Sequence, residues 1–181
     1  TEIKDIAGGN TPLSDGRGGT SSDKKSLFVT GKNTLRITKE ALHSLGTKVK
    51  SIRLSVKDGS VSLRVKELKD VTDGTSYLKI IKKNNVKAVK KVLKNKKYAG
   101  FKAAYGGRLY DVKLVVKGKN IIKTTSKLTV SLKTGKIKTG SIYVLNLKTG
   151  KKIKAKYDKK TKSVVFSTKE LGKFVVALKS N

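Results

Sequence analysis

The chain has 181 residues, and its 44 basic and 12 acidic residues give a formal net charge of +32. The absence of cysteine excludes a disulfide framework, a thiolate metal site and a cysteine nucleophile. The chain is long enough for one domain, or two small ones, with a hydrophobic core. No apolar run approaches the length needed to cross a bilayer, and we expect the chain to be part of a larger multidomain protein.

The basic residues are lysine in all but five cases. Such a charge creates a long-range positive potential, which concentrates polyanions and makes their binding depend on salt. Lysine is a hydrated point charge without the planar fork of arginine, so it recognises charge density rather than a sequence of bases. The alternative is that the lysines only solvate a β surface and keep its edges from aggregating.

Residues 1–26 have the composition of a flexible linker, with the only proline and many glycine, serine and threonine residues. Little in this segment can be buried. We therefore expect a linker over 1–26 and a β-rich domain over 27–181, with a subdivision near 98–107 as an option.

A β-hairpin is predicted around Asp58-Gly59, a dipeptide typical of type I′ turns. Apolar and polar residues alternate on both sides of it, from 52 to 56 and from 61 to 65. A two-residue turn there would place Val56 opposite Val61 and Arg53 opposite Arg64. Because like charges directly opposite each other destabilise a sheet, the two arginines either extend into solvent or hold a shared anion.

Further strands are predicted towards the C-terminus. Gly118 marks the turn of a hairpin over 112–122, and Lys148-Thr149-Gly150 marks that of a hairpin over 142–157. Two more strands are expected over 163–166 and 173–178. Short strands at this spacing, separated by turns, predict an all-β, sandwich-like and mainly antiparallel fold.

Helix is scarce in the predicted fold. Thr38 and Thr168 can each cap a short helix that carries a glutamate in its first turn and ends at Gly46 or Gly172. The spacing of the apolar residues between 82 and 97 favours neither a helix nor a strand, so the conformation of that segment stays open.

Two groups of residues are candidate binding sites. The lysine-dense stretch 82–97 is the best electrostatic footprint for a polyanion. Together with the hairpin arginines it gives the candidate anion-binding residues Arg53, Arg64, Lys82, Lys83, Lys87, Lys90, Lys91, Lys94 and Lys97. An aromatic cluster beside glycines gives the candidate glycan-binding residues Tyr98, Tyr105, Arg108 and Tyr110. Core packing is the alternative for these tyrosines, and the absence of tryptophan weakens the case for a stacking platform.

Catalysis is not expected. His43 is the only histidine, and nothing near it has the form of a nucleophile elbow. A glycosidase needs a carboxyl group with a raised pKa, whereas carboxylates scattered among lysines should have lowered pKa values. Asp70, Asp73 and Gly74 form a small acidic loop without the ligand spacing of a calcium site. We expect no metal ion and no cofactor.

The C-terminal third contains Tyr143-Val144, Lys148-Thr149-Gly150, Tyr157-Asp158, Val164-Val165-Phe166 and Phe174-Val175-Val176. This series resembles the closing motif of repeated extracellular domains in large surface proteins of Gram-positive anaerobes. The stretches 34–45 and 110–119 also resemble that pattern, so the similarity covers nearly all of 27–178. Two places depart from it, because Lys162 stands where glycine is usual and Glu170-Leu171-Gly172 where His-Phe-Ser is usual. The resemblance implies a β-sandwich-like accessory domain of a secreted protein, and it does not imply catalysis.

Charge and resemblance together lead to one leading hypothesis. The chain is expected to be a cell-surface module that binds an anionic polysaccharide or another cell-wall polymer. One alternative is a carbohydrate-binding module that uses the tyrosine cluster to bind plant or host glycans, including neutral ones. The other is a structural spacer. Nucleic-acid binding fits the charge but not the resemblance or the preference for lysine over arginine.

Overall fold

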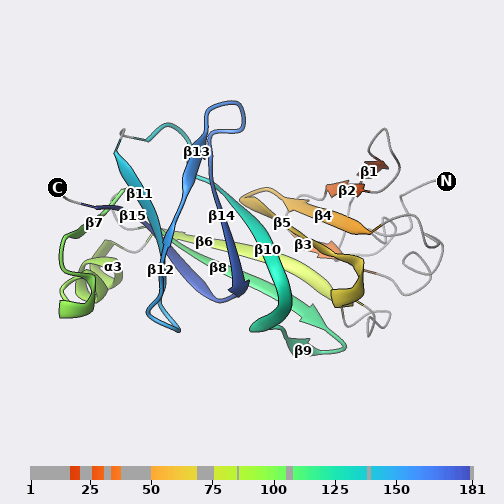
Figure 1. Ribbon diagram of the computed structural model, residues 1–181, viewed down its shortest axis with the longest axis horizontal. Helices are drawn as coiled ribbons and strands as arrows, with labels where there is room; N and C mark the ends of the chain where they lie inside the picture. The colour runs from red at the N-terminus through yellow and green to blue at the C-terminus, as the bar shows by residue number, and fades with distance from the viewer. Residues whose placement is uncertain are drawn as a thin grey trace.

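The computed structural model describes residues 17–20, 26–30, 34–37, 50–68, 76–84, 86–104, 108–137 and 140–179. These residues form two β-sheets whose inner faces share one hydrophobic core (Figure 1). The strands pair mainly in antiparallel fashion, which confirms the predicted all-β, sandwich-like fold. His43 and the acidic loop at Asp70 and Asp73 lie outside the described residues.

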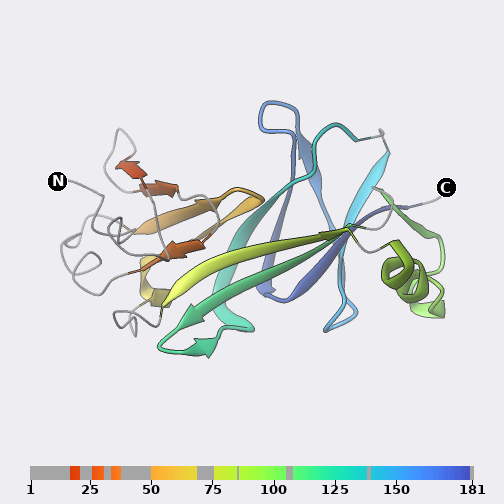
Figure 2. The ribbon, with the colours of Figure 1, turned by 180° about the vertical axis from the view of Figure 1, so that it is seen from behind.

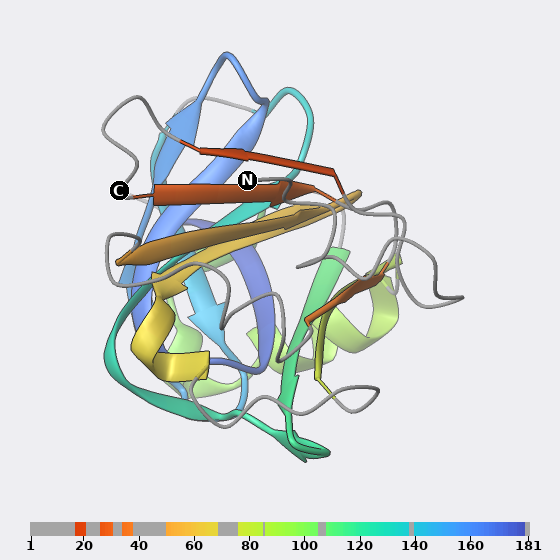
Figure 3. The same ribbon diagram turned by 90° about the vertical axis from the view of Figure 1, so that its right-hand side faces the viewer.

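The first sheet has seven strands. In spatial order they are β1 (Arg17–Thr20), β2 (Ser26–Thr30), β4 (Ser51–Val56), β5 (Gly59–Arg64), β10 (Lys123–Lys133), β14 (Ser163–Glu170) and β13 (Lys156–Asp158). Figure 3, a view from the N-terminal end, shows β1, β2 and β4 side by side, with β2 and β4 parallel. Within the segment expected to be a linker, the structure describes β1 and Ser26, the first residue of β2.

The second sheet has eight strands. Its main path is β12 (Lys152–Lys154), β11 (Ser141–Asn146), β15 (Lys173–Lys179), β8 (Arg108–Val116), β6 (Tyr77–Asn84) and β3 (Thr34–Arg36). Two short strands extend it, since β7 (Phe101–Ala103) pairs with β15 and β9 (Lys119–Asn120) pairs with β8.

Alternation of side chains builds the core between the sheets. In β10, for example, Leu128, Val130 and Leu132 are buried while Thr129 is exposed, as expected when successive side chains point to opposite faces. Phe166 of the first sheet and Phe174 of the second meet edge to face, with ring centroids 5.0 Å apart. This contact lies near the place where the chain passes from β14 to β15 and so from one sheet to the other.

The helical segments in the described part of the chain are short. They are η1 (Val65–Leu68), α3 (Val86–Leu93) and η2 (Lys96–Tyr98), and no helix among the described residues is long and apolar enough to span a membrane. The helix predicted from Thr38 lies outside the described residues. The helix predicted from Thr168 is wrong, because β14 continues to Glu170 and its backbone pairs with β10. The inward alternation of Val164, Phe166 and Thr168 outweighs the local capping pattern.

The hairpin between β4 and β5 forms, but its predicted register is wrong. The turn residues are Lys57 and Asp58, and Gly59 is the first residue of β5, opposite Val56. Neither turn residue has a positive φ, so the turn is not the expected type I′. Gly59 is required for another reason, since a Cβ atom on it would lie 2.2 Å from the backbone oxygen of Ser131 in β10.

The predicted hairpin at Gly118 is confirmed. The hairpin predicted over 142–157 is confirmed as far as Ala155, because β13 pairs with β14 of the first sheet instead. Lys117 and Gly118 have φ values of 53° and 74°, as a type I′ turn between β8 and β9 requires. In the third hairpin, Val144 of β11 lies opposite Ile153 of β12. Both turns are specified by residues next to each other in the chain, which is why the sequence predicts them well.

Candidate anion-binding surface

Helix α3 separates apolar from charged side chains. Val89, Val92 and Leu93 lie on one side, and Val89 is fully buried. The opposite side carries exposed lysines spaced three and four residues apart, Lys87, Lys90, Lys91 and Lys94. These lysines are called the lysine face of α3 below. The segment 82–97, which the sequence pattern left open, thus contains the end of β6, the amphipathic helix α3 and the start of η2.

The outer face of the second sheet carries α3. Val89 packs there in a second, smaller core with Tyr98, Leu145 and Val175. This core lies on the side of β11 and β15 that faces away from the main core. Helix α3 and strand β7 lie at the end of the molecule opposite to β1 and β2 (Figures 1 and 2).

The lysine face has no acidic partner among the described residues. In the described part of the chain, three ion pairs join a lysine to a carboxylate, Lys82–Asp58, Lys113–Asp111 and Lys151–Glu170, and none involves α3. Lysines at i, i+3 and i, i+4 repel one another at a cost of about 0.2–0.5 kcal/mol per pair. A bound polyanion would remove this repulsion, so the arrangement favours binding of negative charge.

The remaining predicted lysines are distributed differently. Lys82 follows Leu78 and Ile80 on the inward side of β6, and its Nζ lies 3.6 Å from Asp58 Oδ1. Lys83 points to the outer face of the sheet opposite Leu109 and is exposed. Lys97 is also exposed. A Cβ atom on Gly150 would lie 2.8 Å from its Nζ, so its side chain runs along the β11–β12 turn.

Arg53 and Arg64 do not face each other. Arg53 lies opposite Ser62, and Arg64 lies opposite Ser51, because the hairpin register differs by two residues from the predicted one. The arginines are diagonal neighbours, with Cα atoms about 7–8 Å apart in such a position, and both are exposed. They lie on the outer face of the first sheet, whereas α3 covers the second. The structure therefore divides the predicted anion-binding residues between two surfaces.

The candidate glycan-binding residues do not form an open platform. Tyr110 is fully buried in the main core and its hydroxyl donates to the Lys133 carbonyl at 2.7 Å. Tyr98 is 3% exposed in the second core, where burial raises its pKa. Arg108 donates through Nη1 to the Thr134 carbonyl at 3.2 Å. Tyr105 lies outside the described residues, so the alternative of core packing holds for Tyr98 and Tyr110.

A different aromatic pair lies on the same outer face of the second sheet as α3. Phe101 of β7 and Tyr143 of β11 meet edge to face with ring centroids 5.3 Å apart, and both side chains are half-buried. Lys152 Nζ lies 5.5 Å from the Phe101 centroid, and Lys179 Nζ lies 5.9 Å from the Tyr143 centroid. The sequence pattern does not predict this contact, because the two rings meet across strand β15. The one available signal was the outward position of Tyr143 in the alternation of β11.

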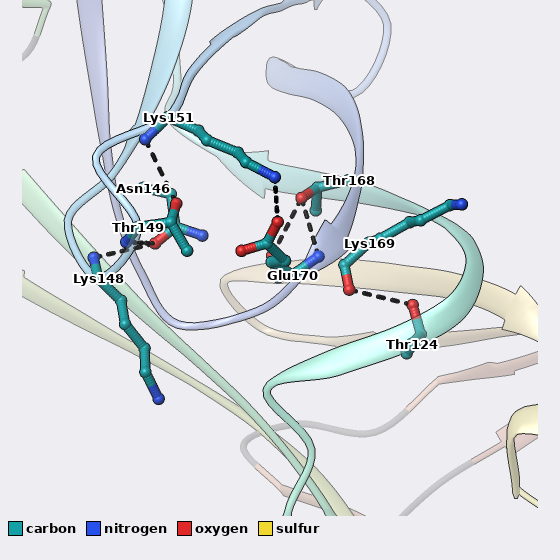
Figure 4. Close-up of polar contacts among 8 residues, drawn as sticks. All are labelled: Thr124, Asn146, Lys148, Thr149, Lys151, Thr168, Lys169 and Glu170. Atoms are coloured by element: carbon teal, nitrogen blue, oxygen red, sulfur yellow. Dashed lines mark hydrogen bonds and ion pairs between the residues drawn. The ribbon is translucent and has the colours of Figure 1, made fainter.

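A polar junction connects the two sheets at the turn between β11 and β12 (Figure 4). Lys151 of the β11–β12 turn forms an ion pair with Glu170 at the end of β14. Asn146 Oδ1 accepts hydrogen bonds from the amides of Lys148 and Thr149, at 3.0 and 3.4 Å, and so holds the same turn. The Asn146 Nδ2 atom is buried and finds no acceptor among the described residues. The junction fixes the hairpin from which the neighbouring lysines project.

The described residues offer little metal-ligating chemistry. They contain no group of three or more histidine, cysteine, aspartate and glutamate side chains that could hold a metal ion. The Glu170 carboxylate accepts from Lys151 Nζ, and two other described carboxylates also have hydrogen-bond donors. Glu67 accepts from Thr125 and Ser126, and Asp158 accepts from the Lys160 amide at 2.9 Å.

Comparison with known proteins gives no relative. No protein-family model matches this chain, and no curated protein or solved structure matches it significantly.

Proposed function

We propose that this chain is a non-catalytic, cationic module that acts outside the cell, as part of a larger surface protein, and binds anionic polymers. The polymer class is a cell-wall glycopolymer or an acidic polysaccharide. The observation that carries the proposal is the lysine face of α3, which is exposed and has no acidic partner among the described residues. The extracellular setting rests on the resemblance of the C-terminal third.

Keeping these positive charges close together costs electrostatic free energy. Unpaired lysines three and four residues apart destabilise the helix that carries them, and the net charge of +32 adds a repulsion over the whole molecule. A polyanion offsets both costs and releases its own counterions on binding. Lysine is suited to this role, because its ammonium group binds many anion geometries with little selectivity.

Affinity electrophoresis tests the proposal. The protein is run in native gels that contain an acidic polysaccharide, bacterial wall material, a neutral polysaccharide or DNA, each at low and at high salt. We expect retardation by the acidic polysaccharide or by the wall polymer, and its loss at high salt. Retardation only by the neutral polysaccharide, or by none of the polymers, would contradict the proposal.

A pair of variants locates the binding surface. The first replaces the lysine face of α3 with glutamine at Lys87, Lys90, Lys91 and Lys94. Its control removes the same charge from exposed lysines elsewhere, at Lys119, Lys123, Lys159 and Lys160. The α3 variant should lose clearly more retardation than the control. Equal losses would mean that net charge, rather than this surface, governs binding.

A further inference from the structure

The aromatic pair Phe101 and Tyr143 occupies the same outer face as α3. The two residues come from strands on either side of β15, where Ala177 lies opposite both Tyr143 and Ala103. Ala177 is fully buried. Its small side chain leaves room for the two rings to meet above β15, so the pair is a product of the sheet order rather than of neighbouring sequence.

Each ring makes a cation–π contact with one lysine ammonium group. Lys152 lies over Phe101 and Lys179 over Tyr143, at 5.5 and 5.9 Å from the ring centroids. Neither lysine forms an ion pair within the described residues. Lys154, which lies directly opposite Tyr143, adds a third exposed cation beside the pair.

The rings change what these lysines can do. A free surface lysine loses rotamer freedom when it binds an anion, and this loss weakens the interaction. An ammonium group that already rests on an aromatic face has given up part of that freedom before the ligand arrives. Lys152 and Lys179 are therefore better prepared to hold an acidic group than the unsupported lysines of α3.

The inclination of the two rings favours a polysaccharide over a nucleic acid. The rings are inclined at 78°, so the edge of one stands beside the face of the other. This gives a stepped surface, whereas a nucleic-acid base stacks on a flat ring face. A pyranose ring with its C–H groups against this step would bring an acidic substituent close to the adjacent ammonium groups.

We infer that Phe101, Tyr143, Lys152 and Lys179 form a subsite for one acidic sugar residue of a polysaccharide, with the sugar ring against the aromatic pair and its carboxylate or sulfate between the two lysines. This subsite rests on the proposed function, since it specifies which anionic polymer the module binds. It also assigns different roles to the two parts of the surface. The lysine face of α3 attracts the polymer, and the subsite positions one of its sugars.

The test measures equilibrium binding of polygalacturonate, dextran sulfate, neutral dextran and single-stranded DNA to the whole chain. The test variant is Lys152→Gln with Lys179→Gln, and its charge-matched control is Lys119→Gln with Lys159→Gln. A third variant, Phe101→Leu, removes one ring at constant charge. Unfolding curves check that each variant is folded. The lysine pair should weaken binding to an acidic polysaccharide about tenfold more than its control, and Phe101→Leu should weaken it several-fold.

The outcomes separate the two proposals. A large specific loss for polygalacturonate or for dextran sulfate supports the subsite, and the polymer that shows it identifies the acidic group as carboxylate or sulfate. Equal losses in the lysine pair and its control overturn the subsite but leave the proposed function intact. If the unmodified protein binds no acidic polymer, both proposals fail. If single-stranded DNA binds as tightly and depends equally on Lys152, Lys179 and Phe101, the choice of a polysaccharide is overturned.

Discussion

Glu67 holds Ser126 through two hydrogen bonds, because its Oε1 accepts from the Ser126 amide at 3.0 Å and from the Ser126 hydroxyl at 2.9 Å. The Thr125 hydroxyl donates to the same oxygen at 2.5 Å. These residues lie where β10 shifts its register against β14, between Lys123 and Leu128. Burial raises the pKa of the Glu67 carboxyl, but the hydrogen bonds lower it by more, so the pKa lies below its ordinary value. The ionised carboxylate thus fixes the bulge of β10.

Glu67→Gln should lower the free energy of unfolding by about 1 kcal/mol at neutral pH, because the charge-assisted hydrogen bonds are lost at a site that is partly exposed to solvent. Since the folded pKa is depressed, this stability is present above the unfolded pKa and is lost as the pH falls through the folded pKa. Urea unfolding across that range should show the two proteins converging at low pH. A difference that stays constant with pH would contradict the role of the ionised carboxylate. Asp158→Asn, with the same change in charge, serves as the control.

Gly59→Ala should destabilise the protein by about 3 kcal/mol, because the added Cβ would lie 2.2 Å from the Ser131 backbone oxygen and β5 would have to move away from β10. Gly118→Ala is the matched control. That glycine has a φ of 74° and nothing within 4 Å of an added Cβ, so only backbone strain of about 1–2 kcal/mol is expected. Urea unfolding of both variants distinguishes crowding from strain, and equal losses would show that Gly59 is not required by the approach of β10.

Lys87→Glu and Lys94→Glu change the charge equally but should affect stability differently. Lys87 lies in the first turn of α3, where no acidic residue is present, and a glutamate there interacts favourably with the helix dipole and with the lysines that follow. At Lys94, just past the end of the helix, the dipole opposes the change. We expect Lys87→Glu to be more stable than Lys94→Glu by about 1 kcal/mol, measured by thermal unfolding. Both should weaken polyanion binding alike, and a loss confined to one of them would contradict a shared lysine face.

Lys162→Gly should stabilise the protein by about 0.5 kcal/mol. Lys162 has a φ of 52°, a left-handed conformation that costs a residue with a side chain about 1–2 kcal/mol, and part of the gain is offset by the greater freedom of glycine in the unfolded chain. Lys160, in the same turn, has no positive φ, so Lys160→Gly should be destabilising. Chemical denaturation of both variants checks the sign, and a loss of stability in Lys162→Gly would refute the assignment of strain.

The sequence predicts those parts of the fold that depend on neighbouring residues. The hairpin at Gly118 and the strands on either side of Gly150 follow from turn chemistry and alternation. The position of Arg53 relative to Arg64 could not be predicted in this way. Glycine is a typical turn residue, but Gly59 lies in a strand because it pairs with β10, which is far away along the chain.

In the candidate site too, some features follow from neighbouring residues and others depend on distant strands. The spacing of apolar and charged residues in α3 is enough to specify an amphipathic helix. The burial of Val89, however, also requires the second sheet. The contact between Phe101 and Tyr143 depends on β7 and β11 taking places on either side of β15, which no local pattern specifies. The burial of Tyr110 depends likewise on which face of β8 meets the core.

The pairing of β5 with β10 also has a consequence for how the chain reaches its native state. Gly59 pairs with Leu132, so the centre of the first sheet joins segments that are far apart in the chain. Loops of this length must close before the pairing contributes any stability, and such topologies fold in milliseconds to seconds rather than microseconds. During synthesis, β4 and β5 emerge well before the strand that completes their sheet. We therefore expect refolding to be slow, with a rate that increases when a soluble polyanion screens the repulsion among the lysines of the unfolded chain.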